Sequence, residues 1–258
     1  MQGWSSTRSR RAWRGTVIAL AAFAVAPSAH PADADLDPAF AGGFAFAHWA
    51  TLATSSVKVA VDPASEAVFL AATGRVESGT DRRFAVAKFR ADGDPDMGFG
   101  FQGLRTIDFD LVDDGYDSLL GAWALPAGRL MLLGTAELPG SAYVPAMARL
   151  TAAGNADPAF GVEGRRVVTS APWPLDDLDI RLVAQHRGGY LFAGWCETGV
   201  QQRSAVVLRV DADGVPDADF GDAGWASMAL PWPTYLESIA VDRDGRIALA
   251  GYEGGMAS

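Results

Sequence analysis

The sequence predicts an all-β fold built from repeats, and two observations carry this prediction. First, one motif with a central phenylalanine occurs four times, at residues 35–43, 93–103, 154–164 and 214–224. Its phenylalanines, Phe40, Phe99, Phe160 and Phe220, are spaced 59, 61 and 60 residues apart. Second, the residues between the motifs form short apolar runs separated by turn residues, with no helical period. Self-similarity at a fixed period is typical of repeat architectures. The motif is termed the signature turn.

Each repeat contains four predicted strands, which we number first to fourth. The third strands, such as YLFAGWC at 190–196, are continuously apolar, which is typical of strands covered on both faces. The second strands alternate, as at Val57, Val59 and Val61, so one of their faces is packed. The first strands follow the signature turns, at 44–49, 104–109, 165–169 and 225–229. Tight turns containing glycine or proline separate the second and third strands.

Every fourth strand carries one basic residue at the same place: Lys88, Arg149 and Arg209. A cation in an apolar strand needs a partner, and the nearest repeated acid is the aspartate of the signature turn. These aspartates are Asp96, Asp157 and Asp217. We therefore predict one internal ion pair in each repeat. We also expect each aspartate to cap backbone amides of its turn, and Phe99, Phe160 and Phe220 to anchor the turns in the core.

Four-stranded units of this length predict a β-propeller-like fold with one blade in each repeat. Residues 35–258 then form a single domain of three complete units and a fourth that lacks its last strand. Residues 35–43 supply only a signature turn. The sequence thus predicts an open or truncated propeller with an exposed edge that another chain could pair with.

The run AVVLRVDADGVPDADFGDAG at 205–224 resembles the delta-60 repeat family, a bacterial β-propeller domain of unknown function. The pattern occurs three times in full and once in part, and covers essentially 35–258. Two departures are Lys88, in place of arginine, and Ala41, in place of the glycine after Phe40. The resemblance implies the propeller fold and export from the cell. It carries no catalytic residue across, because the matching residues are those of turns and core.

Residues 1–34 have the layout of a signal peptide. Four arginines precede the apolar run at 16–26, which is too short to span a bilayer comfortably. Cleavage after Ala34 fits the small-x-small rule. We expect an exported, periplasmic or extracellular bacterial protein without a transmembrane span in the mature chain. Residues 9–13 also resemble a twin-arginine signal, so both export routes stay open, as does a cationic membrane anchor.

The net charge and the single cysteine narrow the possible partners and chemistry. A formal net charge of −10 argues against nucleic acid as a partner. Cys196 cannot form an intrachain disulfide, because it is the only cysteine. Its apolar surroundings predict a buried, inert thiol.

The sequence contains no recognisable catalytic motif, so we predict neither catalytic nor metal-binding residues. Beyond residue 34 it has two histidines, His48 and His186, in different repeats. Nucleophile elbows, dinucleotide fingerprints and phosphate-binding loops are absent from the sequence. The closest approach to a calcium loop is the run of acids Asp211, Asp213, Asp217 and Asp219. Other repeats have Arg90 or Thr151 in place of Asp211. We therefore expect these aspartates to cap their turn, with calcium binding in this one repeat as the alternative. We expect no other cofactor.

The loops between first and second strands hold the best candidates for binding. Trp173 and Trp232 both lie in Pro-Trp-Pro sequences, and acidic residues surround such loops. An aromatic and acidic surface could bind sugars or a cationic ligand. The candidate residues are Trp173, Trp232, Asp113, Asp114, Asp176 and Asp177. The alternative is that each tryptophan simply covers the end of the core.

These observations favour an exported, non-enzymatic β-propeller that binds an unknown protein or glycan ligand. The alternative is a hydrolase or lyase acting on carbohydrates or lactones, with an acid/base pair among Asp113, Asp114, Asp176 and Asp177. Residues that recur in every repeat build the repeat. Functional residues are therefore expected among those that differ between repeats.

Overall fold

The protein is all-β, as predicted, in a computed structural model that describes residues 40, 41, 45, 47, 52–76, 80–199, 202–230 and 234–253. The strands form four antiparallel sheets, termed A to D, of four, four, four and two strands. Within the described residues there is no helix long and apolar enough to cross a membrane. The predicted signal peptide, His48 and Trp232 lie outside the described residues, as does the strand predicted at 44–49, apart from Ala45 and Ala47.

The strands follow one another in the sheets in chain order. Sheet A contains β1 (Leu52–Val61), β2 (Val68–Val76), β3 (Arg82–Phe89) and β4 (Leu104–Ile107). Sheet B contains β5 (Ser118–Leu125), β6 (Arg129–Glu137), β7 (Tyr143–Leu150) and β8 (Arg165–Val167). Sheet C contains β9 (Leu178–His186), β10 (Gly189–Gly199), β11 (Gln202–Val210) and β12 (Trp225–Ala229). Sheet D contains β13 (Thr234–Val241) and β14 (Ile247–Glu253). Two short 3-10 turns, η2 (Pro126–Gly128) and η3 (Leu175–Asp177), complete the described elements.

The strands predicted beyond residue 51 exist, but the sequence grouping of strands into units was wrong by one strand. The predicted first strand of a repeat pairs with the fourth strand of the preceding repeat, as Ile107 of β4 does with Phe84 of β3. The reason is that the signature turn reverses the chain, so the strands on either side of it become antiparallel neighbours. The signature turn therefore lies inside a sheet. The chain passes to the next sheet through the loops that follow β4, β8 and β12.

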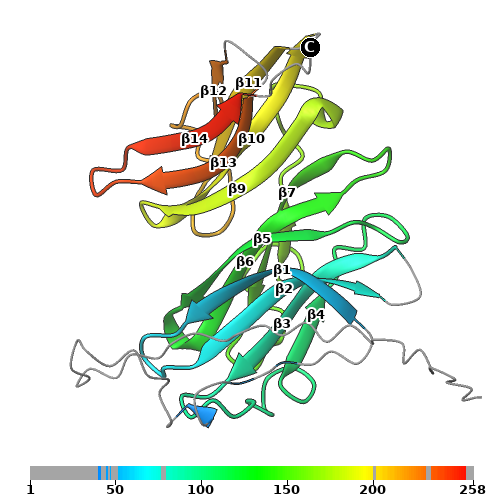
Figure 1. Cartoon of the computed structure of the whole chain (residues 1–258), viewed down its shortest axis with the longest axis vertical. Helices are drawn as coiled ribbons and strands as arrows, with labels where there is room; N and C mark the ends of the chain where they lie inside the picture. Colours follow the sequence, from blue (N-terminus) through cyan, green and yellow to red (C-terminus); the bar gives the residue numbers. More distant parts are fainter. Residues whose placement is uncertain are drawn as a thin grey trace, which may run out of the picture.

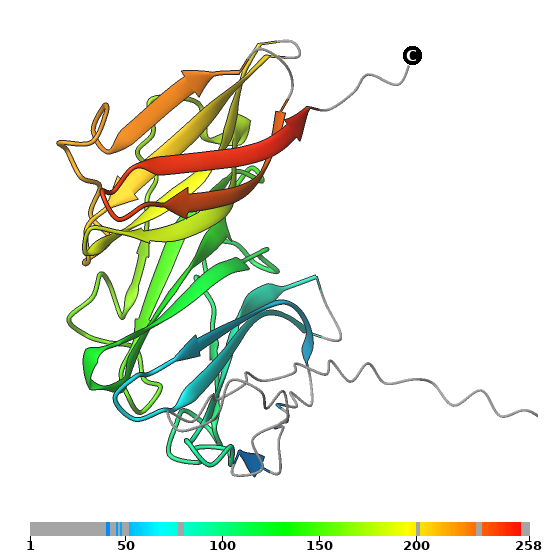
Figure 2. The ribbon, with the colours of Figure 1, turned by 60° about the vertical axis from the view of Figure 1, so that its left-hand side comes forward.

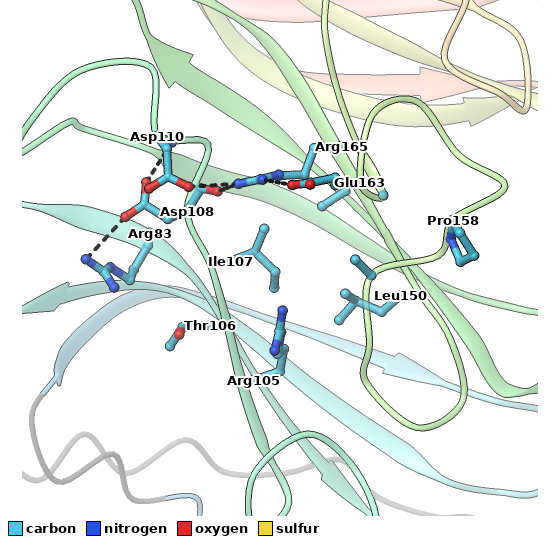
Figure 3. Close-up of a pocket in the computed structure, with 13 residues that line it drawn as sticks. Arg83, Arg105, Thr106, Ile107, Asp108, Asp110, Leu150, Pro158, Glu163 and Arg165 are labelled. Atoms are coloured by element: carbon cyan, nitrogen blue, oxygen red, sulfur yellow. Dashed lines mark hydrogen bonds and ion pairs between the residues drawn. The ribbon is translucent and has the colours of Figure 1, made fainter.

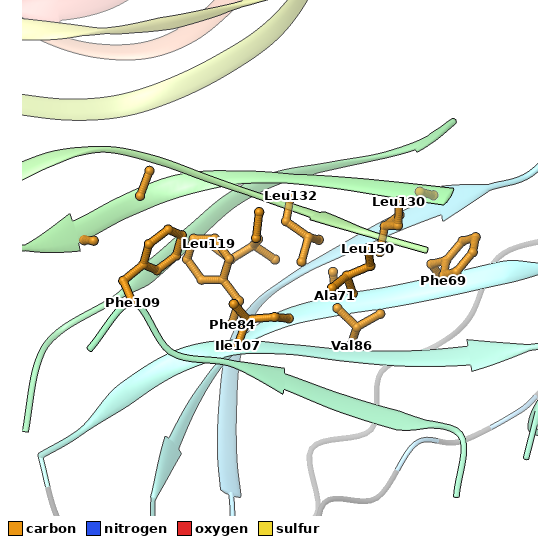
Figure 4. Close-up of a cluster of buried hydrophobic side chains, with 14 of the residues drawn as sticks. Phe69, Ala71, Phe84, Val86, Ile107, Phe109, Leu119, Leu130, Leu132 and Leu150 are labelled. Carbon is orange, nitrogen blue, oxygen red and sulfur yellow. The ribbon is translucent and has the colours of Figure 1, made fainter. Parts of the chain in front are cut away.

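The four sheets are arranged in chain order like the sections of a fan, with sheet A at one end and sheet D at the other (Figures 1 and 2). Neighbouring sheets contact one another through the strands with which each sheet begins. β1 contacts β5, β5 contacts β9, and β9 contacts β13. The apolar core consequently lies in layers between sheets. Between sheets A and B it includes Phe69, Phe84, Leu119, Leu130 and Leu132, all fully buried (Figure 4). Packing between neighbouring sheets is thus the main apolar contribution to stability.

The phenylalanine of each signature turn also packs against the sheet that follows in the chain. Phe40 lies in the cluster on the outer face of sheet A, and Phe99 in the cluster between sheets A and B. Phe160 fills the layer between sheets B and C in the same way, and the less buried Phe220 packs between C and D. Backbone contacts support this junction, since the Gly100 amide donates to a carbonyl oxygen of the next signature turn at 2.8 Å. The signature turn is therefore a turn within one sheet and a contact to the next.

Steric crowding explains why a glycine follows the phenylalanine in each of the three complete signature turns. Gly161 has φ +54°, and a Cβ atom built on it would lie 2.0 Å from the Arg165 carbonyl oxygen. Gly100 and Gly221 show the same close approach to the strand that follows them. Ala41 adopts φ 47° in the incomplete first copy. Only a residue without a side chain fits the three complete turns.

The predicted ion pairs are confirmed in all three complete sheets. Lys88 Nζ lies 2.9 Å from Asp96 Oδ2, and Arg149 Nε lies 2.7 Å from Asp157 Oδ2. The third pair joins Arg209 and Asp217. In each sheet the other carboxylate oxygen accepts an amide of the turn at 3.0 to 3.1 Å, which confirms the predicted capping.

The central pair, Arg149 with Asp157, is the most buried of the three. Both side chains are 8% exposed. Burial raises the pKa of Asp157, but the Ala159 amide and the Arg149 guanidinium outweigh burial, so its pKa falls below the usual value for aspartate. The Arg149 guanidinium also reaches Asp213 of sheet C at 3.2 Å. One cation therefore stabilises a turn and links two sheets.

Two further predictions can be compared with the structure. Cys196 is fully buried, as predicted, and burial raises the pKa of its thiol to about 11, while its inertness stays a prediction. In its described part, sheet D has two strands, and the absence of a last strand from the fourth repeat stays a prediction.

Candidate ligand-binding groove

A groove of about 600 Å³ lies between sheets A and B (Figure 3). One wall comes from β4 and the residues after it, and the other from β7, β8 and the signature turn between them. The second wall is aliphatic and consists of Ala148, Leu150, Ala156 and Pro158. We refer to this recess as the A/B groove.

The rim of the A/B groove is a chain of ion pairs. Arg165 Nη1 lies 3.0 Å from Asp110 Oδ2, and its Nη2 lies 3.0 Å from Glu163 Oε2. Arg83 Nη2 lies 3.2 Å from Asp108 Oδ2, and burial raises the pKa of that carboxyl group. Arg165 also donates to the Asp108 carbonyl oxygen. These five charged side chains are largely paired with one another, and they fix the shape of the rim.

Arg105 is the exception among the charged residues of the groove. Its side chain projects from β4 into the groove, and Figure 3 draws no interaction between it and the acidic residues of the rim. Its Nε atom is buried without a hydrogen-bond partner, as is the Nε atom of Arg83. Unlike Arg83, which pairs with Asp108, Arg105 forms no ion pair within the described residues. Buried donors without partners are rare in native proteins. An unpaired guanidinium beside an aliphatic wall can bind a carboxylate that is attached to an apolar group.

Comparison between the repeats shows that the repeat does not require this cation. The position of Arg105 is occupied by Arg166 in sheet B and by Ala226 in sheet C. The Nε atom of Arg166 is also buried without a partner, but its side chain lies against the turn of the next repeat, near Gly214. Arg105 therefore belongs to the residues that vary between repeats, where function was expected.

The predicted aromatic and acidic surface is only partly observed. Trp173 is half-buried and packs edge-on against Trp225, with ring centroids 5.8 Å apart. This packing agrees with the alternative that the tryptophan covers the end of the core. Trp173 and Asp177 nevertheless line one recess of about 650 Å³ together with Glu197. We refer to it as the Trp173 recess. Trp232, its predicted companion, is not among the described residues.

The four acidic candidates lie on two different connections. Asp113 and Asp114 are exposed in the loop between sheets A and B, whereas Asp176 and Asp177 lie in η3, between sheets B and C. Of the four, Asp177 lines the Trp173 recess. The structure gives no distance between carboxyl groups of the two connections, so the hydrolase or lyase alternative stays a prediction.

Asp117 is the one carboxyl group of these loops with a strongly raised pKa. It is 4% exposed, and its Oδ2 atom accepts the Phe109 amide at 2.9 Å. Burial raises the pKa of Asp117 to about 7. Such a value suits a general acid or base. However, the group is enclosed in the core and holds the loop in place, so its role is structural.

The acids of the predicted calcium run already have protein partners. Asp211 Oδ1 accepts the amides of Asp213 and Val215 at 2.9 and 2.8 Å. Asp213 pairs with Arg149, and Asp217 with Arg209. Within the described ranges no three metal-ligating side chains gather at one point. The run therefore forms turns, and calcium binding stays an untested alternative.

His186 proves to be a structural residue at the end of β9. Its Nδ1 atom lies 3.0 Å from Arg209 Nε, and its Nε2 atom lies 2.9 Å from the Gly245 carbonyl oxygen. Both ring nitrogens are thereby engaged, one in sheet C and the other in the turn of sheet D. The side chain connects two sheets.

No protein-family model matches the chain, and no curated protein matches it. The candidate sites are therefore judged on their geometry. Sequence reasoning missed the A/B groove, although one sign was available. Arginines at 105, 165 and 166 directly follow two of the signature turns, in strands that are too short to bury them.

Proposed function

We propose that this chain is an exported, non-enzymatic binding scaffold of the delta-60 type, built as an open β-propeller-like fan. Three features support the proposal: the layered four-stranded sheets, the signature turns that recur within them, and the signal-peptide layout of residues 1–34. The observation that carries the binding role is the A/B groove with the unpaired guanidinium of Arg105.

The chemistry of the groove favours a protein ligand that ends in an apolar residue with a free carboxylate. Arg105 would pair with the carboxylate, and the aliphatic wall around Leu150 would take the side chain. A carboxylate held by a guanidinium contributes about 1.5–3 kcal/mol, or roughly 10- to 100-fold in affinity. The rim pairs of Arg83 and Arg165 keep those cations engaged, so that the ligand meets one free cation.

The test is a peptide array in which each peptide is presented with a free and with an amidated C-terminus. We expect the protein to retain peptides with a free carboxylate and an apolar last residue. Arg105→Gln should lower the affinity for them by roughly 10- to 100-fold. Arg90→Gln, which removes an exposed arginine that pairs within its own turn, is the matched control and should bind like the parent. Equal retention of amidated peptides, or unchanged binding by Arg105→Gln, would contradict the proposal.

The Trp173 recess supports a second candidate function, the binding of a glycan. Its specific observation is that an indole ring, Asp177 and Glu197 face one recess. Aromatic rings stack on the apolar faces of sugars, and carboxylates accept their hydroxyl groups. A glycan array probed with the parent and with Glu197→Gln and Trp173→Ala variants tests it. Retention of a glycan that both variants lose would support this function, and unchanged retention would exclude the recess.

A further inference from the structure

The outer face of sheet D is uncovered, although the same face is covered in each of the other sheets. Gly74 of β2, Gly134 of β6 and Gly194 of β10 occupy equivalent positions. The residue three positions before each glycine is Ala71 in sheet A, Met131 in sheet B and Leu191 in sheet C. All three are fully buried, because the following sheet packs on them. The equivalent residue in sheet D is Ala248, and it is exposed.

The exposed face of sheet D has small side chains in its middle, and the exposed charged residues Glu237, Asp242 and Arg246 lie at its ends. Cross-strand pairing places Ala240 beside Ala248, and Ser238 beside Ala250, and all four side chains are exposed. Tyr252, 55% exposed, extends the apolar surface at the end of β14, where it stacks on Tyr235. We call this surface the D face.

At the other end of the fan, sheet A has an uncovered apolar stripe on its outer side. Phe40, Ala45 and Ala47 cover the part of this side that β2 and β3 form. The part formed by β1 is open and presents Val57, Val59 and Val61, which are 37%, 42% and 48% exposed. The residues equivalent to Val59 are Ala124 in sheet B, Gln185 in sheet C and Val241 in sheet D. The preceding sheets partly bury Ala124 and Val241. We call this surface the A stripe.

The three internal junctions show which kind of surface covers such a face. In each junction, one sheet contributes the side equivalent to the D face. The next sheet contributes the side equivalent to the A stripe, and the two sides pack together. Large side chains meet small ones, as where Phe69 and Phe84 of sheet A lie in one cluster with Ala122 and Ala124 of sheet B. The D face with its alanines and the A stripe with its valines are the two halves of one more such junction. They lie at opposite ends of the fan (Figures 1 and 2), so one molecule does not join them.

We propose that the D face binds the A stripe of a second copy of this chain, and that two copies associate head to tail. Such a contact is heterologous, and it closes into a ring when the rotation between copies permits. The described residues of each copy form four sheets. Two identical junctions between two such units would close a ring of eight sheets, which lies within the usual size of propellers. This inference concerns assembly, and it stands whether or not the A/B groove binds a ligand.

The test is the molar mass in solution, measured by size-exclusion chromatography with light scattering. The parent chain should have the mass of two copies. Val59→Lys in the A stripe and Ala250→Glu in the D face should each shift the mass to one copy, because each buries an unpaired charge in both junctions. An equimolar mixture of the two variants should return to the mass of two copies, since one junction is then unchanged and the other joins lysine to glutamate.

Met228→Lys is the matched control, since Met228 is 63% exposed on β12 and belongs to neither surface. It should keep the mass of two copies, and circular dichroism should show native sheet content for every variant. Should a variant not fold, single Val59→Cys and Ala250→Cys variants replace it. Their mixture should form a disulfide-linked pair that neither variant forms alone.

Three outcomes would overturn the inference. The first is a parent of one-copy mass up to its solubility limit, and the second is a two-copy mass that neither charge variant changes. The latter would indicate pairing of the β14 edges, the interaction predicted from the sequence. The third is a mixture of the charge variants that stays at the mass of one copy, because a head-to-tail junction requires the mixture to recover.

Discussion

Replacing Asp117 with asparagine should remove most of the pH dependence of stability between pH 4 and 8. Asp117 is 4% exposed, and burial raises its pKa from 3.8 to about 7. In this interval the folded chain holds a proton that the unfolded chain has released. The contribution of this group to stability is therefore fully present below pH 3.8 and is lost as the pH rises through about 7. At 1.36 kcal/mol per pKa unit, the loss is on the order of 4 kcal/mol.

Asparagine has nearly the same shape as aspartate, and its side-chain oxygen can still accept the Phe109 amide. We expect the two proteins to have similar free energies of unfolding near pH 4. The variant should be the more stable one at pH 8, by on the order of 4 kcal/mol. The measurement is urea unfolding at several pH values, followed by tryptophan fluorescence. Asp113→Asn, in the exposed part of the same loop, is the control. A stability difference between parent and Asp117→Asn that does not change with pH would refute the reasoning.

Three further predictions concern the repeat. Gly161→Ala should lower the free energy of unfolding by more than about 3 kcal/mol, because the cost of a positive φ adds to the cost of a clash with β8. Gly140 has a positive φ but open space around it, so Gly140→Ala should cost about 1 kcal/mol. Denaturant titration measures both variants. Arg149→Met should cost about 3–5 kcal/mol, since it removes the buried partner of Asp157 and leaves only the more distant Arg129, 3.8 Å away. Arg90→Met at an exposed pair should cost less than about 1 kcal/mol. Thermal unfolding that ranks these two variants equally would contradict the reasoning. Cys196 should react with a thiol reagent at pH 8 only after unfolding, and mass spectrometry of the native protein would reveal any faster labelling.

The parts of the fold that follow local rules were predictable from the sequence. The strands, the capped turns and the ion pair of Arg149 with Asp157 were predicted because the same residue types recur at one spacing, and each has a local physical reason. The grouping of strands into sheets was wrong for a related reason. Adjacency along the chain suggested that a signature turn ends a unit, whereas hydrogen bonding pairs the strands on both sides of it, as in β3 and β4.

The candidate site could not be predicted in the same way, because its parts come from two repeats. Arg105 lies on sheet A and Leu150 on sheet B, and only the packing of the sheets places them in one groove. The burial of two loop residues likewise depends on packing between sheets, which the sequence does not show. Asp117 belongs to an acidic loop but lies in the core, and Trp173 is half-buried against Trp225.

The central claim is that residues shared by all repeats build the fan, while Arg105, whose position is alanine in sheet C, serves binding. The most direct test measures peptide affinity and the free energy of unfolding on the same samples of Arg105→Gln and Arg149→Met. Arg105→Gln should lose the affinity for C-terminal carboxylates and keep the stability of the parent to within about 1 kcal/mol, because no ion pair is broken. Arg149→Met should lose stability by about 3–5 kcal/mol. An Arg105→Gln variant that unfolds readily, or that binds like the parent, would contradict the claim.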